Sequence, residues 1–102
     1  MKVVINRYYG GFGISETACE FMAARGNTQA IEELARKRYY GNVCNDDRTN
    51  EDLIAAVEFL GSEVASGEGA KLKVVEIPAN VEWEIVEHDG MEHVAETHRT
   101  WR

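Results

Sequence analysis

The sequence has little proline, little cysteine and no long apolar run. Its 102 residues include one proline and two cysteines, and 44% of them are hydrophobic, which is the composition of a folded chain and not of a disordered one. No apolar run approaches the roughly 20 residues that a membrane-spanning helix needs. The N-terminus enters a strand pattern without the apolar segment of a secretory signal. The length favours a single domain, residues 1–102, with a modest core.

The two cysteines fit no metal-site spacing. Cys19 falls on the expected inner face of a helix, and Cys44 falls in a polar loop. We interpret both as reduced thiols of a cytoplasmic protein, because disulfides are rare in that compartment.

Positive charge is also scarce, with 11 basic residues against 18 acidic ones and a formal net charge of −7. Non-specific binding to nucleic acid needs a basic footprint, and docking to an anionic membrane needs a basic surface, so the composition opposes both partners. The arginines are unevenly placed, since Arg7 flanks a glycine turn whereas Arg99 and Arg102 lie at the C-terminus. This distribution is compatible with a local basic pocket on an acidic protein.

Hydrophobic periodicity predicts helices in the middle of the chain. Ser15, then Asn27 or Thr28, then Asn50 are good N-capping residues, each followed by helically spaced apolar positions. Gly26 and Gly61 are expected to end the first and third helices. The predicted helices are 16–25, 29–38 and 51–60.

Strands are expected at both ends of the chain. The β-branched run after Lys2 predicts a buried first strand, Pro78 ends a later one, and Asp89-Gly90 is a strong signal for a two-residue hairpin turn. The order strand, helices, strands predicts an α+β fold, with a small, mainly antiparallel sheet and about three helices packed on one face. The predicted strands are 2–7, 72–77, 83–87 and 91–96.

The most distinctive motif is a glycine-rich turn, residues 10–13, followed by Ser15. Glycines let a ligand approach the backbone, and the helix that starts at Ser15 presents unpaired N–H groups and the positive end of its dipole, which suits a phosphate. The turn lacks the P-loop lysine and a full dinucleotide fingerprint, so glycines that only make a tight connection remain the alternative. Tyr8, Tyr9 and Phe12 either stack on a base or close the core beneath the loop.

Two further segments contain candidate ligand contacts. The C-terminal run from His98 to Arg102 has two arginines, which bind phosphate bidentately, and Trp101, which is rarely left on a frayed tail. A tail with solvated charges is the alternative. Arg48, in the polar run 46–50, either reaches a ligand or belongs to the capping of the third helix.

No catalytic or metal pattern stands out. His88, His93 and His98 are five residues apart, which places consecutive ones on opposite faces of a hairpin and makes a poor metal site. No serine lies in a nucleophile elbow and neither cysteine has an evident base, so we expect no enzymatic activity, no cofactor and no metal. A pair of catalytic carboxylates of the glycosidase type remains an alternative, although nothing in the sequence selects two of the five glutamates near the last hairpin. The glutamates expected on the exposed face of the last hairpin are Glu82, Glu84, Glu87, Glu92 and Glu96.

Three segments resemble a family of small phage and prophage proteins: residues 2–7 with 9–15, residues 48–54 with 57–61, and residues 81–101. They cover most of the chain and leave out 25–45. This family is similar to the phage inhibitors of Thoeris defence, non-enzymatic sponges that sequester cyclic ADP-ribose isomers made by bacterial TIR enzymes. The resemblance implies a homo-oligomer, a dimer or higher, in the host bacterial cytoplasm, with ligand pockets at subunit interfaces. The sequence departs from the family at Tyr8 and Tyr9, where a cysteine is expected at one position.

The first hypothesis is therefore a phage anti-defence protein that binds a small phosphorylated nucleotide and does not degrade it. Its glycine loop and Ser15 would receive a pyrophosphate, Arg99 and Arg48 would neutralise it, and an aromatic side chain would stack on adenine. A second hypothesis is an acidic inhibitor that binds a host nuclease or CRISPR effector, and a third is a small hydrolase that uses His98. The candidate ligand-binding residues are Asn6, Arg7, Tyr9, Gly10, Gly11, Phe12, Gly13, Ser15, Arg48, His98, Arg99 and Trp101.

Overall fold

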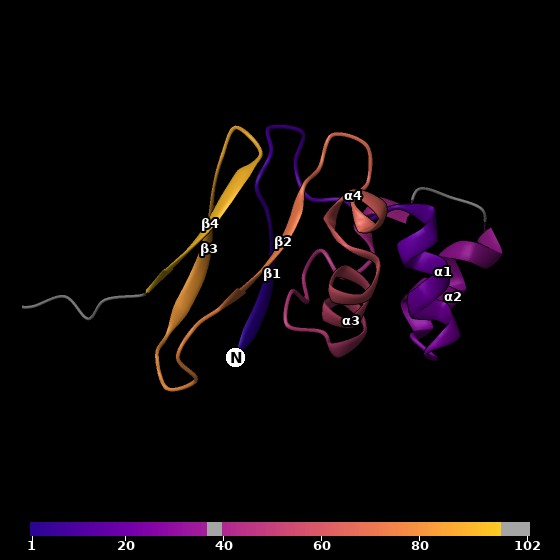
Figure 1. The fold of residues 1–102 in the computed structure, drawn as a ribbon, viewed down its shortest axis with the longest axis horizontal. Coiled ribbons are helices and arrows are strands. Elements are labelled where there is room, and N and C mark those ends of the chain that lie inside the picture. The colour runs from indigo at the N-terminus through magenta and orange to yellow at the C-terminus, as the bar shows by residue number, and fades with distance from the viewer. Residues whose placement is uncertain (37–39, 97–102) are drawn as a thin grey trace, which may run out of the picture.

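The computed structural model describes residues 1–36 and 40–96 (Figure 1). Over these residues the fold is α+β, as the sequence predicts, with four α-helices and two antiparallel two-stranded sheets. In chain order the elements are β1 (Lys2–Asn6), α1 (Glu16–Ala24), α2 (Thr28–Arg36), the 3₁₀ turn η1 (Tyr40–Asn42), α3 (Glu51–Leu60), α4 (Ser62–Ala65), β2 (Leu72–Glu76), β3 (Trp83–His88) and β4 (Met91–Glu96).

The strands form two separate pairs instead of the single small sheet that we expected. β1 pairs with β2, and β3 pairs with β4 across the Asp89-Gly90 turn. The second edge of β1 is occupied by other groups: the Val4 N–H donates to the Arg48 carbonyl (2.9 Å), and the Asn6 N–H donates to the Glu92 carboxylate (2.8 Å). The hairpin therefore meets β1 through a side chain and not through a continuous ladder.

The helices pack on one face of the β1–β2 pair, and the β3–β4 hairpin lies on its other side (Figure 1). Side chains alternate between the two faces of a strand, so Val4, Leu72 and Val74 face the helices. There they join a core that includes Met22 of α1 and Leu53 of α3, both fully buried. The β1–β2 pair is thus the middle layer of the molecule.

Local capping explains where the helices begin, as predicted. The Ser15 Oγ accepts a hydrogen bond from the Ala18 N–H (3.0 Å), and the Asn50 Oδ1 accepts one from the Asp52 N–H (2.9 Å). At α2 the sequence left two residues open, and Asn27 is the one whose side chain accepts from the Ala30 N–H (2.9 Å). The short helix α4 was not expected, because four residues are too few to show a helical period.

The two cysteines are free and buried. Cys44 lies in a turn, as predicted, and its side chain belongs to the core. Burial raises the pKa of each thiol to about 11. In the described part of the chain, none of the helices has the length and apolar character to cross a membrane.

Candidate functional site

The glycine loop is packed against two other loops at one end of the molecule (Figure 1). A Cβ on Gly10 would overlap the backbone of Gly69, and a Cβ on Gly90 would overlap the backbone of Tyr9. The Gly67 N–H also donates to the Gly13 carbonyl (2.9 Å). These glycines therefore allow three loops to pack backbone against backbone, and the space beside them is filled by the protein itself.

Ser15, where we expected a pyrophosphate, is engaged by the short helix α4. Its Oγ donates to the Val64 carbonyl (2.6 Å) and its backbone N–H donates to the Ala65 carbonyl (2.9 Å). Since the same Oγ also caps α1, its single donor hydrogen and one of its two lone pairs have internal partners. The start of α1 is thus a packing contact between two helices.

Arg48 is almost completely buried, with 9% of its surface exposed. Its guanidinium makes five hydrogen bonds: two to Glu92, two to Asn45 and one to the Val4 carbonyl. The guanidinium carbon also lies 3.8 Å from the centroid of the Phe12 ring. All five N–H groups of the arginine are used, so Arg48 has no donor left for a ligand, and one face of Phe12 is covered.

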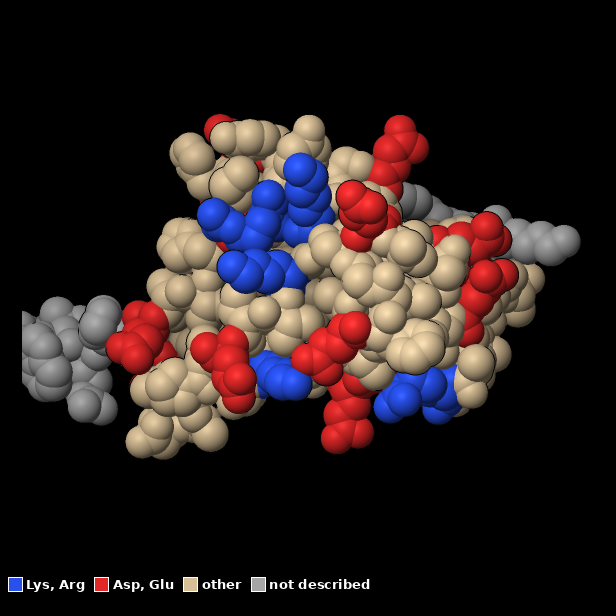
Figure 2. All heavy atoms as spheres, in the orientation of Figure 1, with Lys and Arg blue, Asp and Glu red and all other residues tan. Residues whose placement is uncertain are grey.

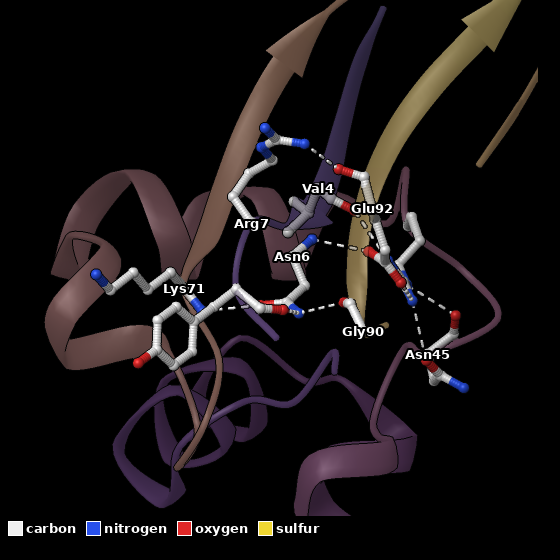
Figure 3. Close-up of polar contacts among 9 residues, drawn as sticks. Val4, Asn6, Arg7, Asn45, Lys71, Gly90 and Glu92 are labelled. Carbon is white, nitrogen blue, oxygen red and sulfur yellow. Dashed lines mark hydrogen bonds and ion pairs between the residues drawn. The ribbon is translucent and has the colours of Figure 1, made fainter. Parts of the chain in front are cut away.

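Asn6 is fully buried beneath the loops. Its Nδ2 donates to the carbonyls of Tyr8 and Gly90, both at 2.7 Å, and its Oδ1 accepts from the Lys71 N–H at 2.8 Å (Figure 3). Every polar atom of this side chain has an internal partner. Asn6 therefore joins the three loops to one another and has a structural role.

Glu92 is the residue that most clearly contradicts the sequence analysis, which placed it on the exposed face of the hairpin. It is 5% exposed and forms a bidentate ion pair with Arg48, at 2.7 and 2.9 Å. The reason lies in tertiary structure, because the docking of the hairpin on β1 turns this one carboxylate inward. Glu84, Glu87 and Glu96 are exposed as expected.

Arg7, in contrast, is exposed and belongs to a cluster of cations that we call the basic face: Arg7, Lys71 and Lys73. The Arg7 N–H donates to the Lys71 carbonyl (2.8 Å), and Lys73 is paired with Ile5 across the strands. By strand alternation Lys73 projects from the face of β1–β2 opposite the helices, and Arg7 lines a groove on that face. Lys71 precedes β2 and lines a hollow beside Ser62 and Glu63 of α4. Figure 2 shows blue side chains gathered over this part of the molecule.

An open groove of about 370 Å³ adjoins the basic face. Its floor is apolar, cations stand at its margin, and β4 contributes one side of it. The residues that line the groove are Ile5, Arg7, Lys73, Val75, Ile77, His93 and Val94.

Two tyrosines stand beside the basic face. The Lys71 ammonium lies 4.9 Å from the centroid of the Tyr8 ring, and Tyr8 and Tyr9 are 43% and 66% exposed. The exposed aromatic surface that the sequence suggested near the glycines therefore comes from the tyrosines.

The sequence analysis missed Lys71 and Lys73. Part of the signal was present, because Lys71 and Lys73 are two residues apart at the start of the predicted strand 72–77. What brings them next to Arg7 is the strand register, which the local pattern does not contain. His98, Arg99 and Trp101 lie outside the described residues.

Within residues 1–36 and 40–96, no group of three or more potential metal ligands comes together. Comparisons with protein-family models, with curated proteins and with solved structures find no match for this chain. The resemblance to phage proteins therefore stays a prediction, and the basic face and the groove are the candidate functional site.

Proposed function

We propose that the protein binds a small phosphorylated nucleotide of the cyclic ADP-ribose type and holds it without converting it, which is the activity expected of a phage anti-defence sponge. The observation that carries this proposal is the basic face next to an apolar groove, on a chain whose net charge is −7. The site differs from the glycine loop and helix start that the sequence suggested.

The charge distribution favours a small anion. Arg7, Lys71 and Lys73 create a local positive field, and arginine and lysine are the side chains that proteins use most for phosphate. A long nucleic acid would extend beyond three residues onto the acidic remainder of the surface, which would repel it. A diphosphate is short enough to lie on the basic face alone.

The groove suits the rest of a nucleotide. Its volume of about 370 Å³ is within the range of roughly 300–1,000 Å³ that is usual for small-molecule sites. A base placed over Ile5, Val75 and Val94 would be removed from contact with water, which is favourable for its apolar surface. The phosphates would remain beside Arg7 and Lys73. The exposed rings of Tyr8 and Tyr9 lie beside the basic face and offer flat surfaces for stacking.

The lining favours capture over catalysis. Of the seven described residues around the groove, His93 is the one whose side chain is of a type that enzymes use as a general base. The lining contains no carboxylate to orient that imidazole and no serine or cysteine nucleophile. Sequestration requires only complementarity and the exclusion of water, and needs no general base or nucleophile.

Calorimetric titration with cyclic ADP-ribose isomers tests the proposal. We expect binding in the micromolar range or tighter, and a loss of at least about tenfold in Arg7→Ala and Lys73→Ala, since each removes a charged hydrogen bond. Arg36→Ala, on the exposed surface of α2, is the matched control and should bind normally. Ligand released by heating should be recovered intact by mass spectrometry. Failure of every isomer to bind at micromolar concentration would refute the proposal.

A second candidate function uses the hairpin. Glu84, Glu87 and Glu96 remain exposed there, and an acidic surface of this kind would suit a protein inhibitor of a nuclease or CRISPR effector. Lys73→Ala discriminates the two candidates, because it should weaken a sponge at least about tenfold and leave an acidic inhibitor active. Light scattering in the same samples measures the homo-oligomer that the resemblance implies.

A further inference from the structure

The β3–β4 hairpin is attached to the rest of the protein without sharing its hydrophobic core. The core cluster contains no residue of the hairpin, and Glu92 is the one hairpin residue that is buried. Val94, which faces the sheet, is partly exposed and lines the open groove. An isolated two-stranded hairpin is only marginally stable in water, so its docking must come from the contacts it makes with β1 and the neighbouring loops.

The polar ones among those contacts converge on Glu92 (Figure 3). One carboxylate oxygen accepts from the Asn6 N–H (2.8 Å) and from Arg48 (2.7 Å), and the other accepts from Arg48 (2.9 Å). The backbone carbonyl of Glu92 accepts from the Arg7 guanidinium (2.7 Å). Glu92 thus binds the buried Arg48 through its carboxylate and Arg7 of the basic face through its backbone carbonyl.

The remaining polar attachments lie close by. The Gly90 carbonyl accepts from the Asn6 side chain (2.7 Å), and the backbone of Gly90 packs against that of Tyr9. These contacts are all made by residues 90–92, at the turn end of the hairpin. The groove is lined by the next residues of β4, His93 and Val94.

We infer that the Arg48–Glu92 ion pair is a latch: the hairpin docks on β1 and leaves it as a unit, and docking completes the groove and orients Arg7. Glu92 is accordingly a positioning residue of the site. The consequence for ligand binding rests on the proposed function. A ligand that touches both the sheet and β4 binds only the docked form, so binding and docking must stabilise each other by linkage.

The chemistry of the pair explains why docking is all-or-none. A buried carboxylate and guanidinium stabilise the structure only while both are present, since either one alone is an uncompensated buried charge. When the hairpin leaves, both groups return to water together. The core on the helix side of β1–β2 loses no apolar partner, so this opening requires less free energy than global unfolding.

Native-state hydrogen exchange of the unmodified protein tests the latch without any ligand. The amides of β3 and β4 should exchange together through an opening that exposes less surface than the opening of α1 and α3, as judged from its smaller dependence on denaturant. Exchange of the hairpin amides only through the global unfolding reaction would overturn the inference.

Glu92→Gln, with Glu84→Gln as its matched control on the exposed side of the same hairpin, tests the ion pair. We expect the hairpin amides of Glu92→Gln to exchange almost as fast as free peptide while α1 and α3 stay protected. Glu84→Gln should keep the protection pattern of the unmodified protein. A uniform loss of protection across the whole chain, or no change in the hairpin, would contradict the latch.

Cyclic ADP-ribose isomers are the probes for the coupling. A saturating isomer should slow exchange of the hairpin at least tenfold in the unmodified protein and should bind Glu92→Gln at least tenfold more weakly than Glu84→Gln. Equal affinity for both variants would overturn the coupling. If no isomer binds the unmodified protein, the coupling fails together with the proposed function, whereas the ligand-free exchange pattern decides the latch by itself.

Discussion

The Oδ1 atom of Asn6 accepts a hydrogen bond from the backbone N–H of Lys71 at 2.8 Å, so a buried amide fixes the strand that presents the basic face. The side chain of Asn6 is out of contact with solvent, yet each of its polar atoms is paired. A ligand site on one surface of β1–β2 is thus tied to polar groups buried beneath the neighbouring loops.

Asn6→Ala should destabilise the protein by about 3 kcal/mol, because it leaves buried backbone groups of Tyr8, Lys71 and Gly90 without their partner. Urea unfolding measures the change in the free energy of unfolding. Asn80→Ala, at an exposed position in the connection between β2 and β3, is the control and should change it by less than about 0.5 kcal/mol. A similar value for both variants would show that the Asn6 network contributes little.

Arg48→Met should weaken docking of the hairpin by about 3–5 kcal/mol, since the docked form would keep the Glu92 carboxylate buried without its counter-charge. The double variant Arg48→Met/Glu92→Leu removes both charges and should recover most of that loss. A double-mutant cycle from native-state hydrogen exchange of the hairpin amides measures the coupling between the two residues. Additive effects of the two substitutions would contradict a tightly coupled pair.

Gly10 and Gly11 are adjacent but constrained for different reasons. A Cβ at Gly10 would overlap the Gly69 backbone, whereas one at Gly11 meets no atom within 4 Å and only strains a φ of +87°. We expect Gly11→Ala to cost about 1 kcal/mol, and Gly10→Ala to cost about 2–4 kcal/mol because two loops must separate. Thermal unfolding of the two variants gives the comparison, and the reverse order would refute the loop packing.

The thiols of Cys19 and Cys44 predict how stability depends on alkaline pH. Burial raises the pKa of each from 9.0 to about 11, so the folded protein favours the neutral thiols. Their contribution to stability is fully present below pH 9 and is lost as the pH rises through 11. Urea midpoints between these values should fall more steeply for the unmodified protein than for Cys19→Ala/Cys44→Ala. If the urea midpoints of both proteins fell equally with pH, the two thiols would not be the cause of the loss of stability.

Much of the fold could be predicted because its signals are local. Ser15 and Asn50 cap helices through bonds to residues two or three positions away, and Asp89-Gly90 turns the hairpin by its own backbone preference. The candidate site could be predicted only in part. Arg7 was among the predicted ligand contacts and lines the groove, whereas the sequence did not show that Gly10 packs against the backbone of Gly69.

The burial of Glu92 is the clearest feature that the sequence pattern does not predict. It follows the same alternating pattern as the exposed hairpin glutamates, and its partner Arg48 lies 44 positions earlier in the chain. Neither residue is distinguished by its neighbours. Their pairing exists only because the hairpin and the loop before α3 meet on the same edge of β1.

The sequence by itself determined the helices, their caps, the hairpin turn and the acidic charge, because each depends on residues close together in the chain or on composition alone. Tertiary structure decided which charges are buried, where the cations gather and what the glycines touch. Register and docking bring together groups that are distant in the sequence, and burial then decides their chemistry. Lys71 is an ordinary lysine in the sequence, and it joins a basic face only when β2 lies beside β1.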